Sequence, residues 1–535
     1  MRGANEMKKV LLIAVALVMA TMSAQAQRRG CLHSEAATRA ENTNRMPKPY
    51  DFDPERTYRV PVVLVSFSDM DFTMESPAEY YNRLFNEQGF NEGAGRGCVT
   101  DYFREQSGGR LNLSFDIYGP IKVSTKAGGR RLTDMYGDSD IIEAFQKLSK
   151  SETTDFVIYD WNDDNKANAV ILIFAGYTGN QKDGYIWPNT GFGMSSMQLP
   201  GRIKPYLTSS SCELWGDSTL CGIGTLVHEF CHCLGLPDLY PMAPATPYSE
   251  FDEWDLMDGG NYVGKGWCPP NLSAMERMYL GWQTPIELTE PSTIRNLKSI
   301  GAGGESFIIR NSARKNEYYI LENRQQAGWD YGVPGNGMLI THIDFSQDLW
   351  LRNEVNTSDS HFRCDLIHAD GKDYLKWDPA NNNSDNNRWT MEDRMRCTYL
   401  STSAYPYTDH LTLEVNDALT DISKPAATLF QAAADGRKFL GKPITNIKQA
   451  ADGSISFDFM GGSEGANIGE IHNEQRIMHN YAGAIYDLSG RRINGSRFTV
   501  NGSGSTDTSV FSVSSVPSVL PKGVYIVNGK KLFVK

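Results

Sequence analysis

The sequence predicts an α+β multidomain protein, with an α/β domain over residues 58–284, a β-sandwich over 285–460 and a small C-terminal β-module over 476–535. Three observations predict this class. Up to residue 284, apolar runs typical of buried strands alternate with segments of helical spacing. Beyond that point, short strand-like runs between turns replace the helical spacing. Residues 461–475 contain few apolar side chains, which is typical of a linker.

Strand and helix signals follow one another in the first domain. Residues 59–67 and 169–175 are apolar enough for buried strands, and 111–117 alternate like a half-buried strand. Apolar residues at helical spacing predict a helix over 99–107, which Gly108-Gly109 ends, and a second helix that Asp138 is expected to cap. This alternation predicts a sheet covered by helices.

The second domain is predicted from strands alone. Strand-like composition occurs at residues 306–310, 317–322, 337–343 and 455–459, with turn residues between them. Regular short strands between turns favour a β-sandwich.

The N-terminus has the features of a secretory signal peptide over residues 1–26. Two lysines precede the apolar run Val10–Ala20, which is too short to span a bilayer comfortably. A small-x-small site ends at Ala26, so the mature chain is expected to begin at Gln27, and an N-terminal anchor helix is the alternative. The polar residues 27–57 could form a short pro-segment. The protein is therefore expected to be secreted or exposed at the cell surface.

Composition excludes several classes of protein. The chain has 535 residues with 52 Lys and Arg against 64 Asp and Glu, a formal net charge of −12. No long basic run is present, so nucleic acid is not an expected partner. A mean hydropathy of −0.42 argues against several membrane spans, and no span is expected in the mature chain. The nine cysteines are an odd number, so at least one thiol is left without an intramolecular disulfide.

One run concentrates residues that can bind a metal ion. His228, Glu229 and His232 form the pattern H-E-x-x-H. Positions i and i+4 share one face of a helix, so both histidines can hold one zinc ion, with Glu229 at the adjoining edge. Gly235 can end the helix in the left-handed conformation. The chain then reverses, which places Asp238 as the expected third ligand.

The same run resembles the metzincin signature H-E-x-x-H-x-x-G-x-x-H/D, and Met257 fits the methionine turn of that group. Other segments are similar to the immune inhibitor A metallopeptidase family, so that the resemblance covers roughly residues 58–460. The segments that carry it are 62–69, 101–108, 236–240, 254–260, 273–282 and 322–325. The resemblance implies a metzincin-like zinc-peptidase domain. Cys98 stands where Ser is expected before the 99–107 helix.

This ligand set predicts the chemistry. Two imidazoles and one carboxylate leave an open position for water at a catalytic zinc. Glu229 is expected to take a proton from the attacking water and pass it to the leaving amine. Metzincins often use a tyrosine near the methionine turn to stabilise the oxyanion. Tyr262 and Tyr240 are the nearest candidates, and packing beneath the turn is the alternative for Tyr240.

A structural calcium ion is a second metal prediction. Asp160, Asn162, Asp164 and Asn168 are spaced like the oxygen donors of a calcium loop. Asn165 stands where such loops have a glycine. The alternative is an acidic surface loop that binds no ion.

The last residues are similar to another family. Ile485–Arg491 and Leu520–Ile526, with the closing lysine-rich hairpin, resemble the C-terminal sorting domain of the Por (type IX) secretion pathway. Asn528-Gly529 is typical of a type I′ hairpin turn. The resemblance implies that the secretion machinery is a partner. A small immunoglobulin-like accessory domain is the alternative.

Together these features predict a secreted zinc metalloendopeptidase acting on protein or peptide substrates. The alternative from another class is a cell-surface binding protein on a catalytically decayed peptidase scaffold, which the intact H-E-x-x-H run argues against. The mechanistic alternative is a gluzincin, with Glu250 or Glu253 as the third ligand. Gly235 and Met257 disfavour it.

Overall fold

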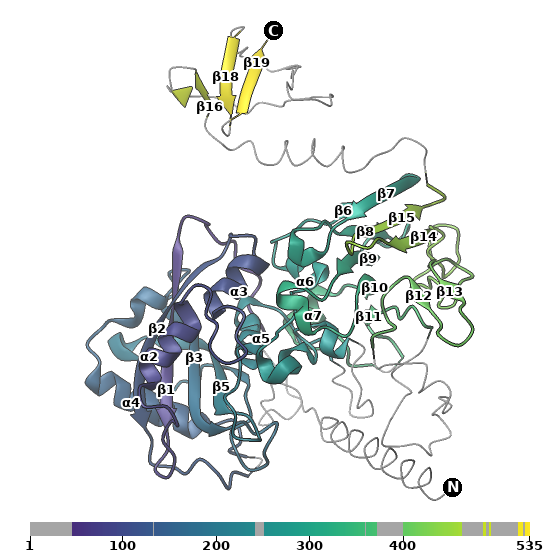
Figure 1. The fold of residues 1–535 in the computed structure, drawn as a ribbon. Coiled ribbons are helices and arrows are strands. Elements are labelled where there is room, and N and C mark those ends of the chain that lie inside the picture. The colour runs from purple at the N-terminus through teal and green to yellow at the C-terminus, as the bar shows by residue number, and fades with distance from the viewer. Residues whose placement is uncertain are drawn as a thin grey trace, which may run out of the picture.

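The computed structural model describes residues 45–131, 133–240, 251–358, 360–371 and 400–462, and four short strands near the C-terminus (Figure 1). The predicted signal peptide, most of the predicted pro-segment and most of the predicted linker and sorting module lie outside the described residues. So do residues 241–250, which include Glu250. Among the described residues no helix combines the length and the apolar character needed to cross a bilayer.

A five-stranded sheet forms the centre of the first half, with the order β2-β1-β3-β5-β4. Strands β1, β2, β3 and β5 are parallel, and the edge strand β4 runs antiparallel to β5. Their bounds are Thr57–Ser66, Asn112–Lys122, Lys166–Tyr177, Thr190–Phe192 and Lys204–Leu214 for β1 to β5. The predicted strands at 59–67, 111–117 and 169–175 are confirmed. A parallel sheet is covered on both faces, which explains why β1 and β3 are nearly continuous apolar runs.

Helices cover both faces of this sheet. Side chains alternate between the faces of a strand, so Val62 and Leu64 of β1 pack with α2 (Pro77–Asn86) and α3 (Val99–Gln106). Val63 and Val65 pack with α4 (Asp138–Ser151) on the opposite face. These helices supply the apolar cover that the alternation of the sequence predicts.

Two helix starts differ in detail from the predictions. Gly137, at φ 74°, is the N-cap of α4, and Asp138 is the first helical residue. Its carboxylate still lies in the first turn, where the helix dipole favours negative charge. Cys98 caps α3, with its Sγ accepting a hydrogen bond from the Asp101 N–H at 3.3 Å. A thiol therefore takes the capping position expected of a serine.

The described part of the second half, up to residue 462, contains three sheets. A five-stranded sheet has the order β11-β10-β9-β8-β6, a three-stranded sheet the order β14-β15-β7, and β12 pairs with β13. The bounds are Ile286–Glu287, Ser292–Leu297, Phe307–Arg310, Glu317–Arg324, Gly337–Asp344, Cys364–Leu366, Tyr407–Thr408, Val415–Asn416, Ile444–Gln449 and Ile455–Phe459 for β6 to β15. The two larger sheets share one hydrophobic core, in which Phe307 and Phe457 meet at 5.6 Å between ring centroids. The two sheets therefore pack on a common core, and the predicted β-sandwich stays a prediction.

A single hydrophobic cluster joins the two halves. It contains Phe230 of α5 (Gly224–Leu234) and Met275 of α6 (Ala274–Tyr279). It also contains Leu339 of β10 and Trp350 of α7 (Gln347–Leu351). Figure 1 shows α5, α6 and α7 between the first sheet and the strands of the second half. The two halves therefore pack across the position where the sequence suggests a domain boundary.

The described strands near the C-terminus form a separate four-stranded sheet, with the order β17-β16-β18-β19. Their bounds are Ile485–Asp487, Arg492–Ile493, Gly523–Val527 and Lys530–Val534 for β16 to β19. Val527 pairs with Lys530, so the two strands of the predicted hairpin pair antiparallel, while the predicted turn residues Asn528 and Gly529 lie outside the described residues. The sorting role stays a prediction.

Candidate metal centre

Helix α5 carries the H-E-x-x-H residues, and it ends where the sequence predicts. Gly235 has φ 106°, and its N–H donates to the carbonyl of His232. A Cβ on Gly235 would lie 2.6 Å from the carbonyl oxygen of Pro47. Glycine is therefore required both by the left-handed conformation and by the close approach of another backbone. The chain reverses after this residue and brings Asp238 back towards the helix.

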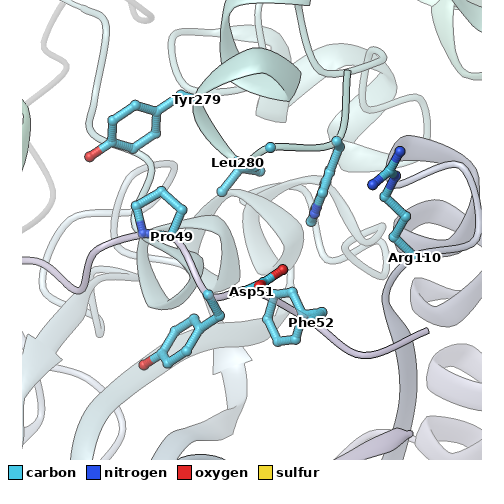
Figure 2. Close-up of a pocket in the computed structure, with 9 residues that line it drawn as sticks. Pro49, Asp51, Phe52, Arg110, Tyr279 and Leu280 are labelled. Carbon is cyan, nitrogen blue, oxygen red and sulfur yellow. The ribbon is translucent and has the colours of Figure 1, made fainter. Parts of the chain in front are cut away.

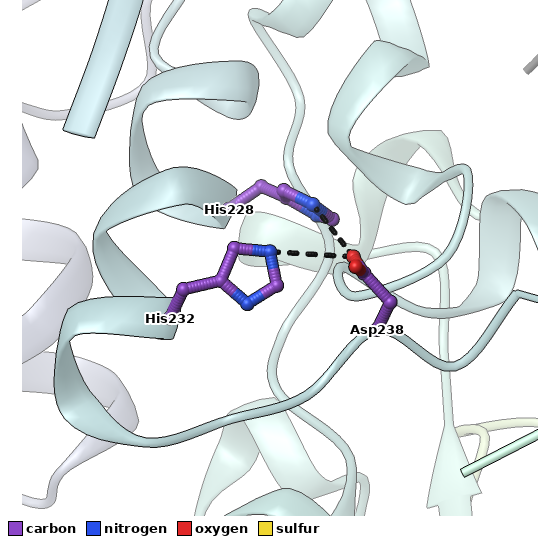
Figure 3. Close-up of side chains that lie close together, drawn as sticks. All are labelled: His228, His232 and Asp238. Atoms are coloured by element: carbon purple, nitrogen blue, oxygen red, sulfur yellow. Dashed lines mark ion pairs between the residues drawn. The ribbon is translucent and has the colours of Figure 1, made fainter. Parts of the chain in front are cut away.

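His228, His232 and Asp238 meet in the interior of the protein. Figure 3 shows the two imidazoles of α5 directed towards the Asp238 carboxylate. The Nε2 atom of each histidine lies 3.3 Å from Asp238 Oδ1. One ligand atom from each residue lies within 4.8 Å of the other two, and the three side chains are at most 1% exposed. These three residues form the only such cluster of His, Cys, Asp or Glu within the described part of the chain.

Backbone carbonyls orient both imidazoles. His228 Nδ1 lies 2.8 Å from the carbonyl oxygen of Leu256, and His232 Nδ1 lies 2.8 Å from that of Leu236. A carbonyl can only accept, so each Nδ1 carries a proton, and Nε2 is the atom that is left to bind a metal when the imidazole is neutral. Both Nε2 atoms and Asp238 Oδ1 are buried and have no hydrogen-bond partner. Three ligand atoms that lack hydrogen bonds and converge on one point fit a metal ion.

The predicted methionine turn supports this arrangement. Met257 is fully buried, and its carbonyl accepts a hydrogen bond from the Leu239 N–H at 2.9 Å. The preceding residue, Leu256, supplies the carbonyl that orients His228. The turn therefore contacts both the first histidine and the chain that follows Asp238.

The electrostatics of the site favour a positive charge. Burial lowers the pKa of His228, but its interaction with Asp238 and the charge of Glu229 outweigh burial and raise the pKa to about 9. Burial raises the pKa of Asp238, but His232 and His228 hold it well below its usual range. A carboxylate that stays ionised in the interior attracts a cation between itself and the imidazoles.

Glu229 lies beside the edge strand of the sheet. The Thr190 hydroxyl of β4 lies 2.9 Å from Glu229 Oε2 and 2.7 Å from the Glu229 carbonyl oxygen. Both oxygens accept when the carboxylate is ionised, so they share the single hydroxyl proton. Sequence reasoning missed Thr190, because nothing in a three-residue strand indicates which helix it contacts.

A second residue that sequence reasoning missed is Asn353, which follows α7. Its side-chain amide contacts Asp238 at both ends, at 2.6 Å and 2.7 Å. The two residues are 115 positions apart. An asparagine with φ 57° at the end of a short helix is ordinary C-terminal capping chemistry, so the sequence carries no signal for this contact.

The donor set fits zinc. Two imidazole nitrogens and one carboxylate oxygen are the ligand types of catalytic zinc sites with three protein ligands. The gluzincin alternative places Glu253 in this role, but Asp238 is the residue that the structure groups with the histidines. This grouping supports the metzincin-type ligand set.

The predicted calcium loop closes on its own backbone. Asp160 Oδ1 accepts hydrogen bonds from the N–H groups of Asn162 and Asp164, and Oδ2 accepts one from Asn165. Asn168 accepts from the Trp161 N–H at 2.6 Å. Asn165 adopts φ 63°, the left-handed conformation that glycine supplies in calcium loops. The acidic-loop alternative accounts for these contacts, and the calcium ion stays a prediction.

The two predicted oxyanion residues lie near the turn. Tyr240 is 8% exposed, and the ring of Tyr262 lies 6.1 Å from that of Trp215. Their catalytic role stays a prediction.

A separate cavity of about 230 Å³ lies elsewhere (Figure 2). It is lined by Pro49, Tyr50, Asp51, Phe52, Arg110, Tyr279, Leu280, Gly281 and Trp282. None of the predicted ligands lines it, so this cavity is not the metal centre.

Comparison with known proteins agrees with this chemistry. Residues 216–284 match the family model described as immune inhibitor A peptidase M6, catalytic domain. Pre-pro-metalloprotease PrtV of Vibrio cholerae is 22% identical over 280 residues, which cover 43% of this chain and 30% of the relative. Immune inhibitor A of Bacillus thuringiensis is 23% identical over 285 residues, which cover 43% of this chain and 40% of the relative. The chain thus spans less than half the length of these relatives. The similarities support a metallopeptidase of the immune inhibitor A type.

Proposed function

We propose that the protein is a secreted zinc-dependent metalloendopeptidase that hydrolyses peptide bonds of protein substrates. The observation that carries the proposal is the convergence of three orphaned ligand atoms, from His228, His232 and Asp238, next to a buried glutamate. The family match over residues 216–284 includes all four residues.

Zinc held by these three residues would polarise the scissile carbonyl and make the attacking water more acidic. Glu229 accepts the proton of that water and delivers it to the leaving amine. With zinc bound, the ion and its three ligands would carry a net charge of +1, because Asp238 is negative. A neutral histidine in place of Asp238 would leave this charge at +2. Leu256 and Leu236 keep both imidazoles in the tautomer that can bind a metal.

A metal-removal experiment tests the proposal. The purified protein is assayed on an unfolded protein substrate, with and without a zinc chelator, and zinc is then restored. We expect internal cleavage that the chelator abolishes and zinc restores. A chain that contains zinc but cleaves nothing would favour the binding-protein alternative, and cleavage that resists metal removal would exclude the proposed mechanism.

We also propose that residues 1–26 direct export and that the module at 476–535 is recognised by the secretion machinery. The relative named pre-pro-metalloprotease agrees with a removable N-terminal segment. The predicted linker at 461–475 has few apolar side chains to bury, and such a segment can be cleaved without unfolding its neighbours. A chain truncated after Gly461 should keep peptidase activity but fail to reach the cell surface in its native host. Normal export of the truncated chain would contradict the sorting role.

A further inference from the structure

The contact between Asn353 and Asp238 uses both ends of one amide. Asn353 Nδ2 donates to Asp238 Oδ2 at 2.7 Å, and the Asp238 N–H donates to Asn353 Oδ1 at 2.6 Å. Both residues are buried, at 4% and 0% exposure. The amide therefore fixes the backbone and the carboxylate of Asp238 at the same time.

This contact determines which carboxylate oxygen faces the histidines. Oδ2 is taken by Asn353, whereas Oδ1 lies 3.3 Å from both Nε2 atoms and accepts no hydrogen bond. An amide carries no charge, so it orients the Asp238 carboxylate without neutralising it. A lysine or an arginine in the same place would neutralise it. The carboxylate keeps its full negative charge and presents one oxygen to the site.

The segment that carries Asn353 is itself held in place. The Asn353 N–H donates to the carbonyl of Trp350, whose side chain is fully buried. Asn356 donates from Nδ2 to the Leu239 carbonyl at 2.7 Å and accepts from the Cys364 N–H at 3.1 Å. Two amides from residues 353–356 therefore hold two consecutive residues of the chain that follows α5. Such rigid support is what a metal ligand requires of its surroundings.

We propose that Asn353 is a positioning residue for the metal centre, which holds Asp238 Oδ1 in the geometry that binds zinc. The second half of the chain thereby sets the zinc affinity of a site whose ligands all lie in the first half. This inference rests on the proposed zinc site. It adds a residue that contacts neither the metal nor the substrate.

Asn353→Gly is the direct test, because glycine keeps the left-handed backbone and removes only the amide. Zinc affinity is measured by competition with a chromogenic chelator, in the full chain. We expect affinity to fall about 10- to 100-fold, the usual cost of losing an outer partner of a ligand. Asn353→Asp is the second variant, because it keeps an acceptor for the Asp238 N–H but cannot donate to Oδ2. It should also weaken zinc binding.

Asn446→Gly is the matched control. Asn446 is an exposed residue of β14 with φ 53°, and its amide donates to Asp458 Oδ2 at 2.7 Å rather than to a residue of the metal centre. This variant should bind zinc like the wild type. In an Asp238→Ala background, Asn353→Gly should cause little further loss, because its effect passes through that carboxylate.

Unchanged affinity in both Asn353 variants would overturn the inference alone. So would an equal loss with and without Asp238. A wild-type chain that binds zinc no more tightly than a His228→Ala, His232→Ala variant would overturn the proposed function and this inference with it. Circular dichroism of each metal-free variant shows whether the affinity refers to folded protein.

Discussion

The two halves of the chain contribute to the metal centre in different ways. Helix α5 and its turn supply His228, Glu229, His232 and Asp238 within one short run, and three of their side-chain atoms have no hydrogen bond. Within the described residues, the second half contributes the amides of residues 353–356, and these are hydrogen bonded. The reactive groups therefore come from one short run of sequence, whereas their orientation depends on residues that are distant in sequence.

Loss of the proton carrier should have the largest effect. Glu229→Ala removes the general base and leaves the ligands in place, so proteolysis should fall by about 10²- to 10⁴-fold. Zinc content, measured by atomic absorption, should not change. Retained proteolysis in a pure sample would show that the local run does not carry the chemistry.

Loss of the third ligand should affect metal binding rather than proton transfer. Asp238→Ala should lower zinc affinity by more than the 10- to 100-fold typical of an outer partner. Glu253→Ala should keep zinc, because Glu253 is not part of the ligand cluster. Metal content after dialysis compares the two variants, and the reverse result would establish the gluzincin alternative.

Loss of the hydroxyl on β4 should have a smaller effect. Thr190→Val keeps the shape of the side chain but removes its hydrogen bond to Glu229. One hydrogen bond contributes about 1 kcal/mol, so kcat should fall about fivefold with little change in KM. Thr190→Ser keeps the hydroxyl and should behave like the wild type. Equal losses in both variants would point to packing rather than to the positioning of Glu229.

The smallest effect concerns Glu276 and the way the free energy of unfolding depends on pH. Burial and the charge of Asp255 raise the pKa of Glu276 well above 4.5. The protonated form is therefore favoured by folding, and this contribution to stability is complete below pH 4.5 and is lost as pH rises through the folded pKa. The glutamine of Glu276→Gln cannot ionise, so the free energy of unfolding of this variant should fall less as pH rises.

Urea unfolding at several pH values checks this expectation. The comparison is the difference in the free energy of unfolding between wild type and Glu276→Gln, which cancels the titration of other groups. A difference that does not change with pH would contradict a shifted Glu276.

The sequence predicted those elements whose signals are local. The strands around residues 59–67, 169–175 and 455–459 are present, because an apolar run is buried wherever it finds a partner. Helix α3 is present and ends at Gln106, one residue before the predicted end at 107. The three-residue strand β4 could not be predicted, because it is defined by pairing with β5 rather than by its own composition.

The sequence by itself determined the donors of the candidate site and the turn that brings them together. The spacing of His228 and His232 on a helix and the left-handed Gly235 are properties of the local backbone. Only the tertiary structure decided that Thr190 reaches Glu229 and that Asn353 orients Asp238. The physical reason is that periodicity and capping act over a few residues. A hydrogen bond across 115 positions exists only once the two halves have packed around a common core.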